Sequence, residues 1–524
     1  MQHSLYWQSE WPNIKLLLPT KNHPGTVDKS FSLKRPHVIF AFSVMMNSDT
    51  TILINELEKI DSSMQKAAAE FAGLIDKVHP SNRNNALNLL HYLALRSLDI
   101  RELQDMLHAA GLSSMASSES HIRGQLLAIL QRLGVRKEIP PGTFGYESGK
   151  RSLSERAAHL FGKKDTDLMP YIMVTFDTSL ADDYGKIKNL LQSGMNVARI
   201  NCAHDNESTW FRMIQHIKRA SKVTGLECRI YMDLAGPKIR TVIPGKGKLK
   251  VEEGMQLFLT DEASLTDDKK TVGCTVPGIA GQINTGETVL FDDGLIEAKA
   301  EKAEGDKLVL QVTRISSKKP FIKNEKGINF PESVLTMPAL TEFDKSCLPF
   351  ILKHADMVGC SFVRNTKDIL QLQEAKGKNK KTSLIIKIET PEAVKNLPHL
   401  LFTGLREENI GLMIARGDLA VEIGFERMSE IQEEILWICE AAHVPVIWAT
   451  QVLDNLNKSG VATRSEITDA AHAAQADCVM INKGDHIIQT IETLRDILIR
   501  SGGHHVKKRY TFRPLNIATR FMTH

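Results

Sequence analysis

Apolar runs and helical windows alternate along the chain from about residue 170 to residue 499. Short apolar or β-branched runs, each suited to one strand, cover residues 171–176, 196–202, 228–234, 357–363, 383–389, 409–418, 444–450 and 478–482. Windows with apolar residues at steps of three and four follow the first two runs and then cover residues 342–353, 367–375, 391–397, 428–442, 464–474 and 487–499. Eight β–α units in series predict an α/β fold, a closed parallel (βα)8 TIM barrel.

One of these units is interrupted. Between residues 242 and 326 the pattern changes to short alternating segments punctuated by glycine, such as residues 288–291 and 307–312. Alternation with period two and glycine-rich turns indicates a small all-β domain. We therefore expect a small inserted β-barrel that divides the TIM barrel into residues 169–241 and 327–502.

The residues before the predicted barrel have a different pattern of hydrophobic and polar positions. Residues 48–137 repeat leucine and isoleucine at helical steps, which predicts an α-helical domain. Residues 1–47 carry four prolines, so we expect an irregular N-terminal segment there. Pro140-Pro141-Gly142 opens a polar stretch, and residues 138–168 are interpreted as a linker. Residues 503–524 are interpreted as a C-terminal tail.

Composition narrows the class of protein. The chain has 524 residues, of which 42% are hydrophobic and 24% charged, and its formal net charge is +4. This charge is too small for its length to indicate nucleic acid or an anionic membrane as a partner, and no window is apolar for long enough to span a bilayer. The seven cysteines have no zinc spacing and indicate buried free thiols in the cytoplasm: Cys202, Cys228, Cys274, Cys347, Cys360, Cys439 and Cys478.

Charged side chains follow several of the predicted strands. In TIM barrels the active site lies at the carboxyl ends of the strands, and Glu389 and Asp418 come from the ends of two neighbouring strands. Two carboxylates suit a hard cation such as Mg²⁺ or Mn²⁺. Lys387 points to the same side as Glu389, because strand residues alternate faces. A lysine in that position can balance the charge on a transferring phosphoryl group.

Further cations and a backbone turn complete this predicted site. Arg199, Lys238 and Arg240 could bind phosphate oxygens, and free N–H groups at residues 415–418 could bind a substrate carboxylate. Taken singly, these residues have simpler interpretations, such as a surface salt bridge, a helix N-cap for Asp418 or a loop hydrogen bond for His204. Their joint placement at successive strand ends favours one functional site.

These residues belong to blocks that closely resemble the pyruvate kinase family. The blocks run from about residue 170 to residue 498 and are residues 194–201 (GMNVARIN), 236–241 (GPKIRT), 292–295 (DDGL), 326–329 (KGIN), 387–389 (KIE), 413–423 (MIARGDLAVEI), 449–453 (ATQVL) and 463–466 (TRSE). The resemblance implies a glycolytic phosphotransferase that moves a phosphoryl group from phosphoenolpyruvate to ADP, giving pyruvate and ATP. It also implies that the β insertion is a lid.

The resemblance assigns roles to particular residues. Glu389 and Asp418 would hold the divalent metal, and Lys387 would stabilise the phosphoryl group in flight. The substrate would contact Arg199, Ala415, Arg416, Gly417, Asp418 and Thr450, with Thr450 near the enolpyruvate carbon that is protonated. The nucleotide phosphates would contact Asn201, His204, Arg240 and Lys326.

Departures from the family pattern concern its K⁺ site. Asn201 and Asp233 keep two of the usual ligands, but Ala203 and Leu234 stand where the family has Ser and Thr. Lys238 stands where the family has Glu. This resembles the branch in which a lysine supplies the charge of the ion, so we expect K⁺ not to be required.

Other departures leave two alternatives open. Residues 176–178 and 482–484 replace family loops, and the blocks end without a counterpart of the family's C-terminal allosteric domain. One alternative is therefore a weak or inactive phosphoenolpyruvate-binding regulatory or scaffold protein, whose helical domain docks a partner. The other is a metal-dependent aldolase or lyase acting on a 2-oxo acid. A homo-oligomer is compatible with every one of these interpretations.

Overall fold

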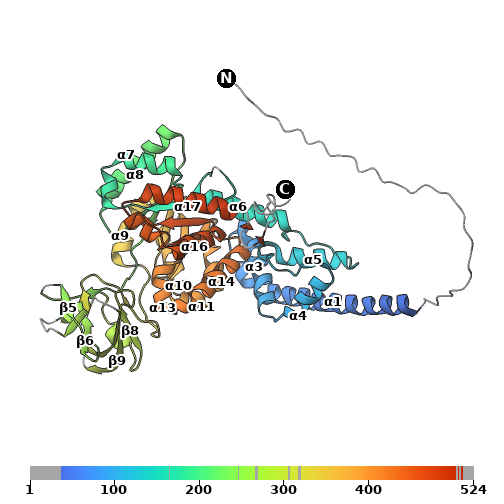
Figure 1. Ribbon diagram of the computed structural model, residues 1–524, viewed down its shortest axis with the longest axis horizontal. Helices are drawn as coiled ribbons and strands as arrows, with labels where there is room; N and C mark the ends of the chain where they lie inside the picture. Colours follow the sequence, from blue (N-terminus) through green and yellow to red (C-terminus); the bar gives the residue numbers. More distant parts are fainter. Residues whose placement is uncertain are drawn as a thin grey trace, which may run out of the picture. The chain divides into compact units, whose positions relative to one another are not determined.

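Eight parallel strands close into a barrel in the order β1-β17-β16-β15-β14-β13-β3-β2, and Figure 1 shows helices around this barrel. The structure is a computed structural model that describes residues 37–164, 166–245, 247–265, 270–304, 307–316, 320–502, 505–506 and 509–510. The barrel strands are β1 (Tyr171–Thr175), β2 (Val197–Asn201), β3 (Arg229–Asp233), β13 (Met357–Cys360), β14 (Ser383–Ile388), β15 (Ile410–Ala415), β16 (Val446–Ala449) and β17 (Cys478–Ile481). This confirms the predicted TIM barrel.

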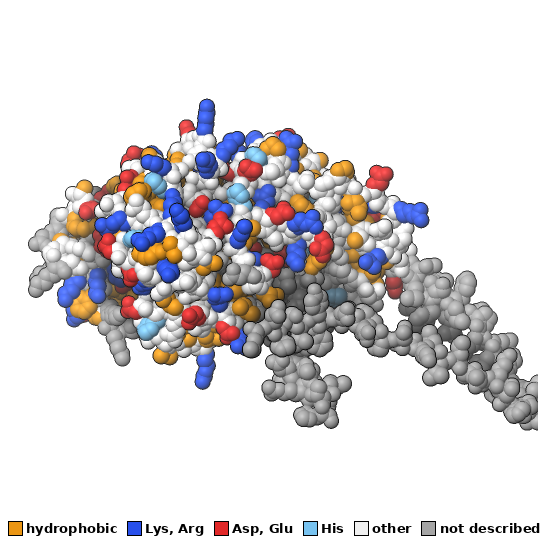
Figure 2. Space-filling view, turned by 90° about the horizontal axis from the view of Figure 1, so that it is seen from above, with side chains coloured by type: hydrophobic (Ala, Val, Ile, Leu, Met, Phe, Trp, Pro, Cys, Tyr) orange, Lys and Arg blue, Asp and Glu red, His pale blue; other side chains and the backbone are white. Residues whose placement is uncertain are grey.

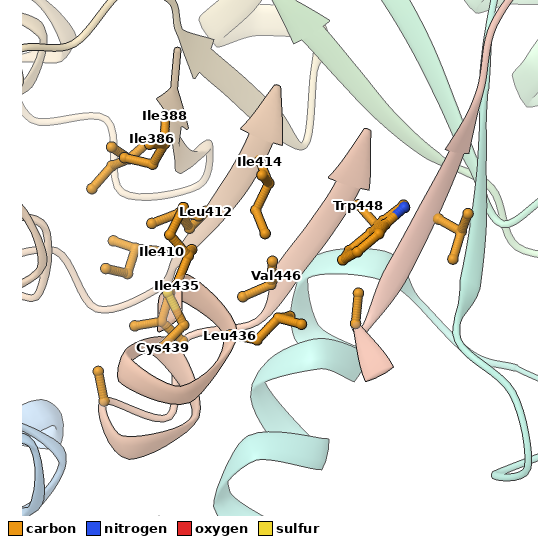
Figure 3. Close-up of a cluster of buried hydrophobic side chains, with 14 of the residues drawn as sticks. Ile386, Ile388, Ile410, Leu412, Ile414, Ile435, Leu436, Cys439, Val446 and Trp448 are labelled. Atoms are coloured by element: carbon orange, nitrogen blue, oxygen red, sulfur yellow. The ribbon is translucent and has the colours of Figure 1, made fainter. Parts of the chain in front are cut away.

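Helices follow the strands on the outside of the barrel. They are α7 (Tyr184–Ser193), α8 (Glu207–Thr224), α9 (Glu342–His354), α10 (Thr366–Lys376), α11 (Pro391–Lys395), α12 (Leu397–Gly404), α13 (Arg416–Ile423), α14 (Met428–Ala441), α15 (Asp454–Ser459), α16 (Arg464–His472) and α17 (Ile487–Gly502). Alternate strand residues pack against them. Figure 3 shows this packing between β15 and α14, where the labelled side chains are Ile410, Leu412, Ile414, Ile435, Leu436 and Cys439.

The segment interpreted as a linker contains a helix, which corrects that interpretation. Helix α6 (Tyr146–Phe161) carries Leu153, Ala157, Leu160 and Phe161 on one buried face. The last three belong to the cluster that fills the inside of the barrel, and the Phe161 and Tyr171 rings are 5.3 Å apart. The helix therefore packs against the barrel interior, and its polar residues, which suggested a linker, lie on its other faces.

The predicted β insertion is confirmed as an all-β unit with its own core. Its seven-stranded sheet has the order β12-β8-β9-β10-β6-β7-β4, and β11 pairs with β5. The strands are β4 (Thr241–Val242), β5 (Lys248–Lys250), β6 (Gln256–Asp261), β7 (Thr271–Cys274), β8 (Thr288–Phe291), β9 (Ile296–Glu304), β10 (Lys307–Ile315), β11 (Phe321–Lys323) and β12 (Ile328–Asn329). The chain enters and leaves it side by side, since the Thr241 N–H donates to the Lys326 carbonyl over 2.8 Å. We call it the lid domain.

The helical segment before α6 comprises α1 (His37–Glu70), α2 (Ala72–Ile75), α3 (Arg83–Arg96), α4 (Arg101–Ala109) and α5 (Ile122–Arg132). Its helices were predicted, but its buried side chains continue into the cluster under the barrel helices, so it is not a separate core. Buried amides join the two parts: Asn82 Nδ2 donates to the Leu405 carbonyl over 3.0 Å, and Asn88 Nδ2 to the Ala441 carbonyl over 2.8 Å. We call it the helical segment.

The chain ends are described only in part. Helix α1 begins at His37, so the expectation of an irregular segment is wrong for residues 37–47, and residues 1–36 lie outside the described residues. Most of the predicted tail also lies outside them, apart from the short antiparallel pair β18 (His505–Val506) and β19 (Arg509–Tyr510).

The cysteines are free thiols, as expected from the composition. Six of the seven cysteine side chains are buried and Cys228 is partly buried, and none forms a disulfide. No helix in the described part of the chain is long and apolar enough to cross a membrane. On the face seen in Figure 2, Lys and Arg side chains are mixed with Asp and Glu.

Candidate active site at the carboxyl ends of the barrel strands

A buried carboxylate lies at the centre of the predicted site. Asp233 ends β3 and is fully buried. Its Oδ2 atom is 2.6 Å from Arg199 Nη2 of β2 and 3.3 Å from Lys387 Nζ of β14. Tyr231 precedes Asp233 by two positions on the same face of the strand and donates its hydroxyl to Oδ1 over 2.9 Å. The closed barrel thus brings cations from two strands onto one carboxylate.

The charges in this cluster stabilise one another. Burial acts to raise the pKa of Asp233, but the neighbouring Lys387 and Arg199 charges more than offset it, and the pKa lies below its ordinary value. Burial acts to lower the pKa of Lys387, yet Asp233 and Glu389 together raise that pKa. The lysine is therefore an ammonium and the aspartate a carboxylate at neutral pH.

The two predicted metal ligands lie next to this cluster. Glu389 Oε1 is 3.1 Å from Lys387 Nζ, and Oε2 accepts the Phe362 N–H over 2.6 Å. Burial raises the pKa of Glu389, the Lys387 charge opposes this rise, and the negative charge of Asp418 adds to it. Asp418 Oδ1 is 2.6 Å from Lys238 Nζ, which comes from the loop after β3.

The two predicted metal ligands interact electrostatically. The negative charge of Asp418 adds to the burial that disfavours ionisation of Glu389, and a shared positive charge would offset this effect. Mg²⁺ is commonly held in proteins by one or two carboxylates, with substrate oxygens and water completing its shell. Within the described ranges no group of three or more His, Cys, Asp or Glu side chains is arranged for a metal ion, so Glu389 and Asp418 could supply only part of such a shell.

The turn at residues 415–418 is held by hydrogen bonds to Thr450, which follows the next strand, β16. The Gly417 N–H donates to Thr450 Oγ1 over 2.8 Å, and Thr450 has a φ of 68°. Arg416 donates to the Thr450 carbonyl over 2.6 Å and to the Asp469 carboxylate. The N–H groups of this turn were expected to be free, and that of Gly417 is not. Ala415 nevertheless ends β15, and Thr450 directly follows the end of the adjacent strand β16, which brings the turn and Thr450 together.

The four residues predicted for nucleotide phosphates form a looser group. Arg240 Nη1 donates to the Glu325 carbonyl over 2.9 Å, and Lys326 Nζ is 2.7 Å from Asp292 Oδ1. Both cations therefore lie where the chain enters and leaves the lid domain. Burial lowers the pKa of His204, as do the charges of Lys483, Arg240 and Arg199. Asn201 is occupied within its own loop, because its Oδ1 accepts the Ala203 N–H over 3.1 Å.

Lys238 was predicted to belong to a monovalent-ion region with Asn201 and Asp233, but it contacts a different carboxylate. Its ammonium pairs with Asp418, whereas Asp233 already has Arg199 and Lys387 as cation partners. The three residues Asn201, Asp233 and Lys238 therefore form no common side-chain contact.

Two further residues make contacts at the site, although the sequence assigned them no role. Ser361, directly after β13, accepts from Lys387 Nζ over 2.7 Å and donates to the Leu234 carbonyl over 2.7 Å. Asn329 Nδ2, from the last strand of the lid domain, donates to Glu422 Oε1 of α13 over 2.7 Å. The position of Ser361 at a strand end was a usable signal, whereas no sequence spacing links Asn329 to Glu422.

Comparison with known proteins gives a consistent match. Residues 171–486 match the family model described as pyruvate kinase, barrel domain. A pyruvate kinase of Bacillus licheniformis is 34% identical over 326 residues, 60% of this chain and 54% of the relative. One of Geobacillus stearothermophilus is 32% identical over 330 residues, 61% of this chain and 55% of the relative. The chain thus spans a little over half the length of the relatives that it matches.

Proposed function

The chain belongs to the pyruvate kinase family, and on this premise we propose that it transfers a phosphoryl group from phosphoenolpyruvate to ADP. The bond between phosphorus and the enol oxygen breaks, and a bond to a β-phosphate oxygen of ADP forms. The enolate then takes a proton on its terminal carbon and becomes pyruvate. The observation that carries the proposal is the buried cluster of Lys387 with Asp233 and Glu389 at the strand ends.

Lys387 is the residue best placed to meet the moving phosphoryl group. Enzymes of this reaction type act mainly by positioning and by offsetting negative charge. The raised pKa of Lys387, caused by its two carboxylate neighbours despite burial, keeps it charged. Arg199, fixed on Asp233 beside it, supplies a second cation for phosphate oxygens. Both side chains are held before substrate arrives, so little reorganisation is needed.

The turn after β15 would orient the enolpyruvate part of the substrate. Ala415 is the N-cap of α13, which begins with Arg416 and Gly417, and helix N-termini favour carboxylates. Thr450 is held against Gly417 and would stand beside the carbon that is protonated. Glu389 and Asp418 would hold Mg²⁺ or Mn²⁺, and the ion would supply positive charge that offsets the negative charge of the transferring phosphoryl group.

Nucleotide phosphates would be bound where the lid domain joins the barrel. Arg240 and Lys326 lie at the two ends of the lid domain, and Arg240 acts electrostatically on His204. Asn201 belongs to the same loop as His204. Closure of the lid domain over this place would exclude water from the transferring group.

K⁺ is proposed not to be required. Asp233 has two cationic partners, Arg199 and Lys387, and Asp418 has the ammonium of Lys238 at 2.6 Å. These contacts supply the positive charge that a monovalent ion would otherwise bring. The cytoplasmic location, a homo-oligomer and docking of a partner by the helical segment stay predictions.

Pyruvate release tests the proposed function. Purified protein with Mg²⁺, phosphoenolpyruvate and ADP should release pyruvate, and Lys387→Met should slow release by at least about 100-fold, the usual cost of losing one charge-stabilising donor. Lys395→Met, which changes an exposed lysine of α11, is the matched control and should keep the wild-type rate.

One result would favour a different function. Wild-type protein that releases no pyruvate, yet binds phosphoenolpyruvate in a metal-dependent way by calorimetry, would contradict the kinase proposal and favour a regulatory or scaffold protein.

A further inference from the structure

A second cavity lies between the helical segment and the outside of the barrel. Its volume is about 1060 Å³, and none of the residues assigned to the strand-end site lines it. One wall comes from α3, α4 and the loop at residues 115–119, and the other from α14, α16 and the turn after α16. The volume is at the upper end of that of small-molecule sites in proteins.

One arginine in this cavity, Arg96, has no carboxylate partner among the residues that the structure describes. The Arg96 guanidinium lies over the Trp437 ring, 4.7 Å from its centre, and 5.6 Å from the centre of the Tyr92 ring. Its Nη1 atom donates to the Tyr92 hydroxyl over 2.7 Å. Among the described residues Arg96 forms an ion pair with no Asp or Glu side chain. Two rings and a hydroxyl thus hold an exposed guanidinium in place, which prepares it to bind an anion.

The other charges that line the cavity limit which anion fits. Arg101 is paired with Asp99 at 2.5 Å, and His472 with Glu433 at 2.7 Å. The one further carboxylate among the lining residues is the buried Glu119, which would repel a multiply charged phosphate. Arg96, with no ion-pair partner among the described residues and with Glu119 on the same lining, therefore favours a ligand with a single negative charge.

The remaining lining is apolar or aromatic. Leu95 and Met115 are buried on the helical segment, and the Trp437 ring faces the same space from α14. We propose that this cavity binds an organic monocarboxylate with an apolar body, whose carboxylate pairs with Arg96 and whose body packs on Leu95, Met115 and Trp437.

The loop beside Arg96 supports a binding role. Met115 and Ser117 line the cavity and have φ values of 66° and 58°, a region that side chains with a Cβ rarely adopt. Gln104 holds the loop by donating to the Ser114 carbonyl over 3.1 Å, and the Ser118 hydroxyl donates to the Met115 carbonyl. Residues held in such conformations concentrate at ligand-binding sites.

The cavity is connected to the strand-end site by stacked side chains. His472 lines the cavity, and its ring meets the Trp448 ring at a centre distance of 5.5 Å. Arg416 lies over the same Trp448 ring at 4.6 Å and donates to the Thr450 carbonyl; Figure 3 shows Trp448 on its strand. A ligand that shifts His472 would therefore change the turn at residues 415–418. This regulatory effect rests on the proposed function, whereas binding itself does not.

Calorimetry with matched probes tests the binding site. The probes are propionate, 4-methylvalerate and 3-phenylpropionate, with 3-phenylpropanol as the uncharged analogue, L-phenylalanine as the amino-acid analogue and inorganic phosphate. We expect at least one of the three carboxylates to bind and to change Trp437 fluorescence, and the alcohol and phosphate to bind at least about tenfold more weakly, as expected when a charge-assisted hydrogen bond is lost. Binding of L-phenylalanine as tight as that of 3-phenylpropionate would identify amino acids as the source of the carboxylate.

Variants of the arginine complete the binding test. Arg96→Met should weaken binding at least about tenfold, and Arg96→Lys, which keeps the charge but loses the planar fork, should also weaken it. Arg132→Met changes an exposed arginine of α5 outside the cavity and should leave affinity unchanged. The proposal is overturned if no carboxylate binds, if the alcohol or phosphate binds as tightly, or if both Arg96 variants retain wild-type affinity.

Kinetics test the connection separately. In wild-type protein the bound carboxylate should change the KM for phosphoenolpyruvate, and in His472→Ala this change should disappear while calorimetry still detects binding. An equal kinetic effect in both proteins would overturn the connection. A protein without transferase activity would fail this experiment but not calorimetry, so failure of the proposed function is distinguishable from failure of the binding site.

Discussion

At the scale of single residues, the site depends on which charges are paired with which. Lys387 and Arg199 share Asp233, and Lys238 holds Asp418. Lys387, Glu389 and Asp418 could be predicted from the sequence because each one lies within a few residues of the end of a strand. Their partners could not, because a residue at a strand end can face several neighbours and only the tertiary structure selects one.

Lys238 should be needed for turnover while K⁺ is not. Wild-type protein should release pyruvate at the same rate in potassium chloride and in choline chloride. Lys238→Gln should slow release at least about tenfold, because Asp418 loses its ammonium partner. Strong stimulation of the wild type by K⁺ in a salt titration would contradict the prediction. Lys222→Gln, at an exposed position of α8, is the control.

Glu422 should make stability depend on pH. Burial raises its pKa to about 7, partly opposed by the Asn329 hydrogen bond, whereas its ordinary value is 4.5. Between these values the folded protein keeps a proton that the unfolded chain has lost. The contribution of Glu422 is therefore complete below about pH 4.5 and is lost as the pH rises through about 7.

Glu422→Gln cannot ionise and keeps an acceptor for Asn329, so it should remove this dependence. Denaturant unfolding of both proteins without metal, at several pH values between about 4.5 and 8, should show a steeper fall for the wild type. The difference should be on the order of 3 kcal/mol at most. Parallel curves for the two proteins would contradict the assigned pKa.

At the scale of elements, α6 is a helix that the local pattern of the sequence did not predict. Its apolar residues recur at helical spacing, but Pro140-Pro141-Gly142 and many polar residues nearby indicated a linker. The helix is stable because Leu160 and Phe161 are buried in the barrel interior. Most helical stability in proteins comes from such packing, which the local sequence does not contain.

Leu160→Ala should therefore destabilise the whole barrel. Removing a fully buried leucine side chain costs about 3 kcal/mol or more, because a cavity is left behind. His159→Ala, at the exposed neighbouring position, should cost much less. Thermal unfolding followed by circular dichroism compares the two variants. Equal midpoints would show that α6 does not contribute to the barrel core.

At the scale of the whole molecule, the lid domain and the barrel have separate hydrophobic cores. The lid domain has its own cluster of buried residues, whereas the helical segment shares one with the barrel helices. The lid domain is thus joined to the barrel mainly through its two ends and through contacts such as the one between Asn329 and Glu422.

Replacing residues 242–326 by a short glycine linker should therefore leave a folded barrel. The retained ends already meet, since Arg240 and Gly327 form an antiparallel bridge. Circular dichroism should keep a cooperative transition, but pyruvate release should fall at least about 100-fold, because water is no longer excluded from the site. Unfolding of the shortened protein, or unchanged turnover, would contradict the prediction.

The sequence by itself determined the barrel, the β insertion, the helices of the helical segment and the group of residues at the strand ends. Each of these follows from a period in the chain or from the rule that parallel strands end together. Only the tertiary structure decided that α6 fills the barrel, that Lys238 pairs with Asp418 and that Arg96 lies over the Trp437 ring in a cavity beside α14. Those facts depend on contacts between residues far apart in the chain, which no local pattern of hydrophobic and polar positions can encode.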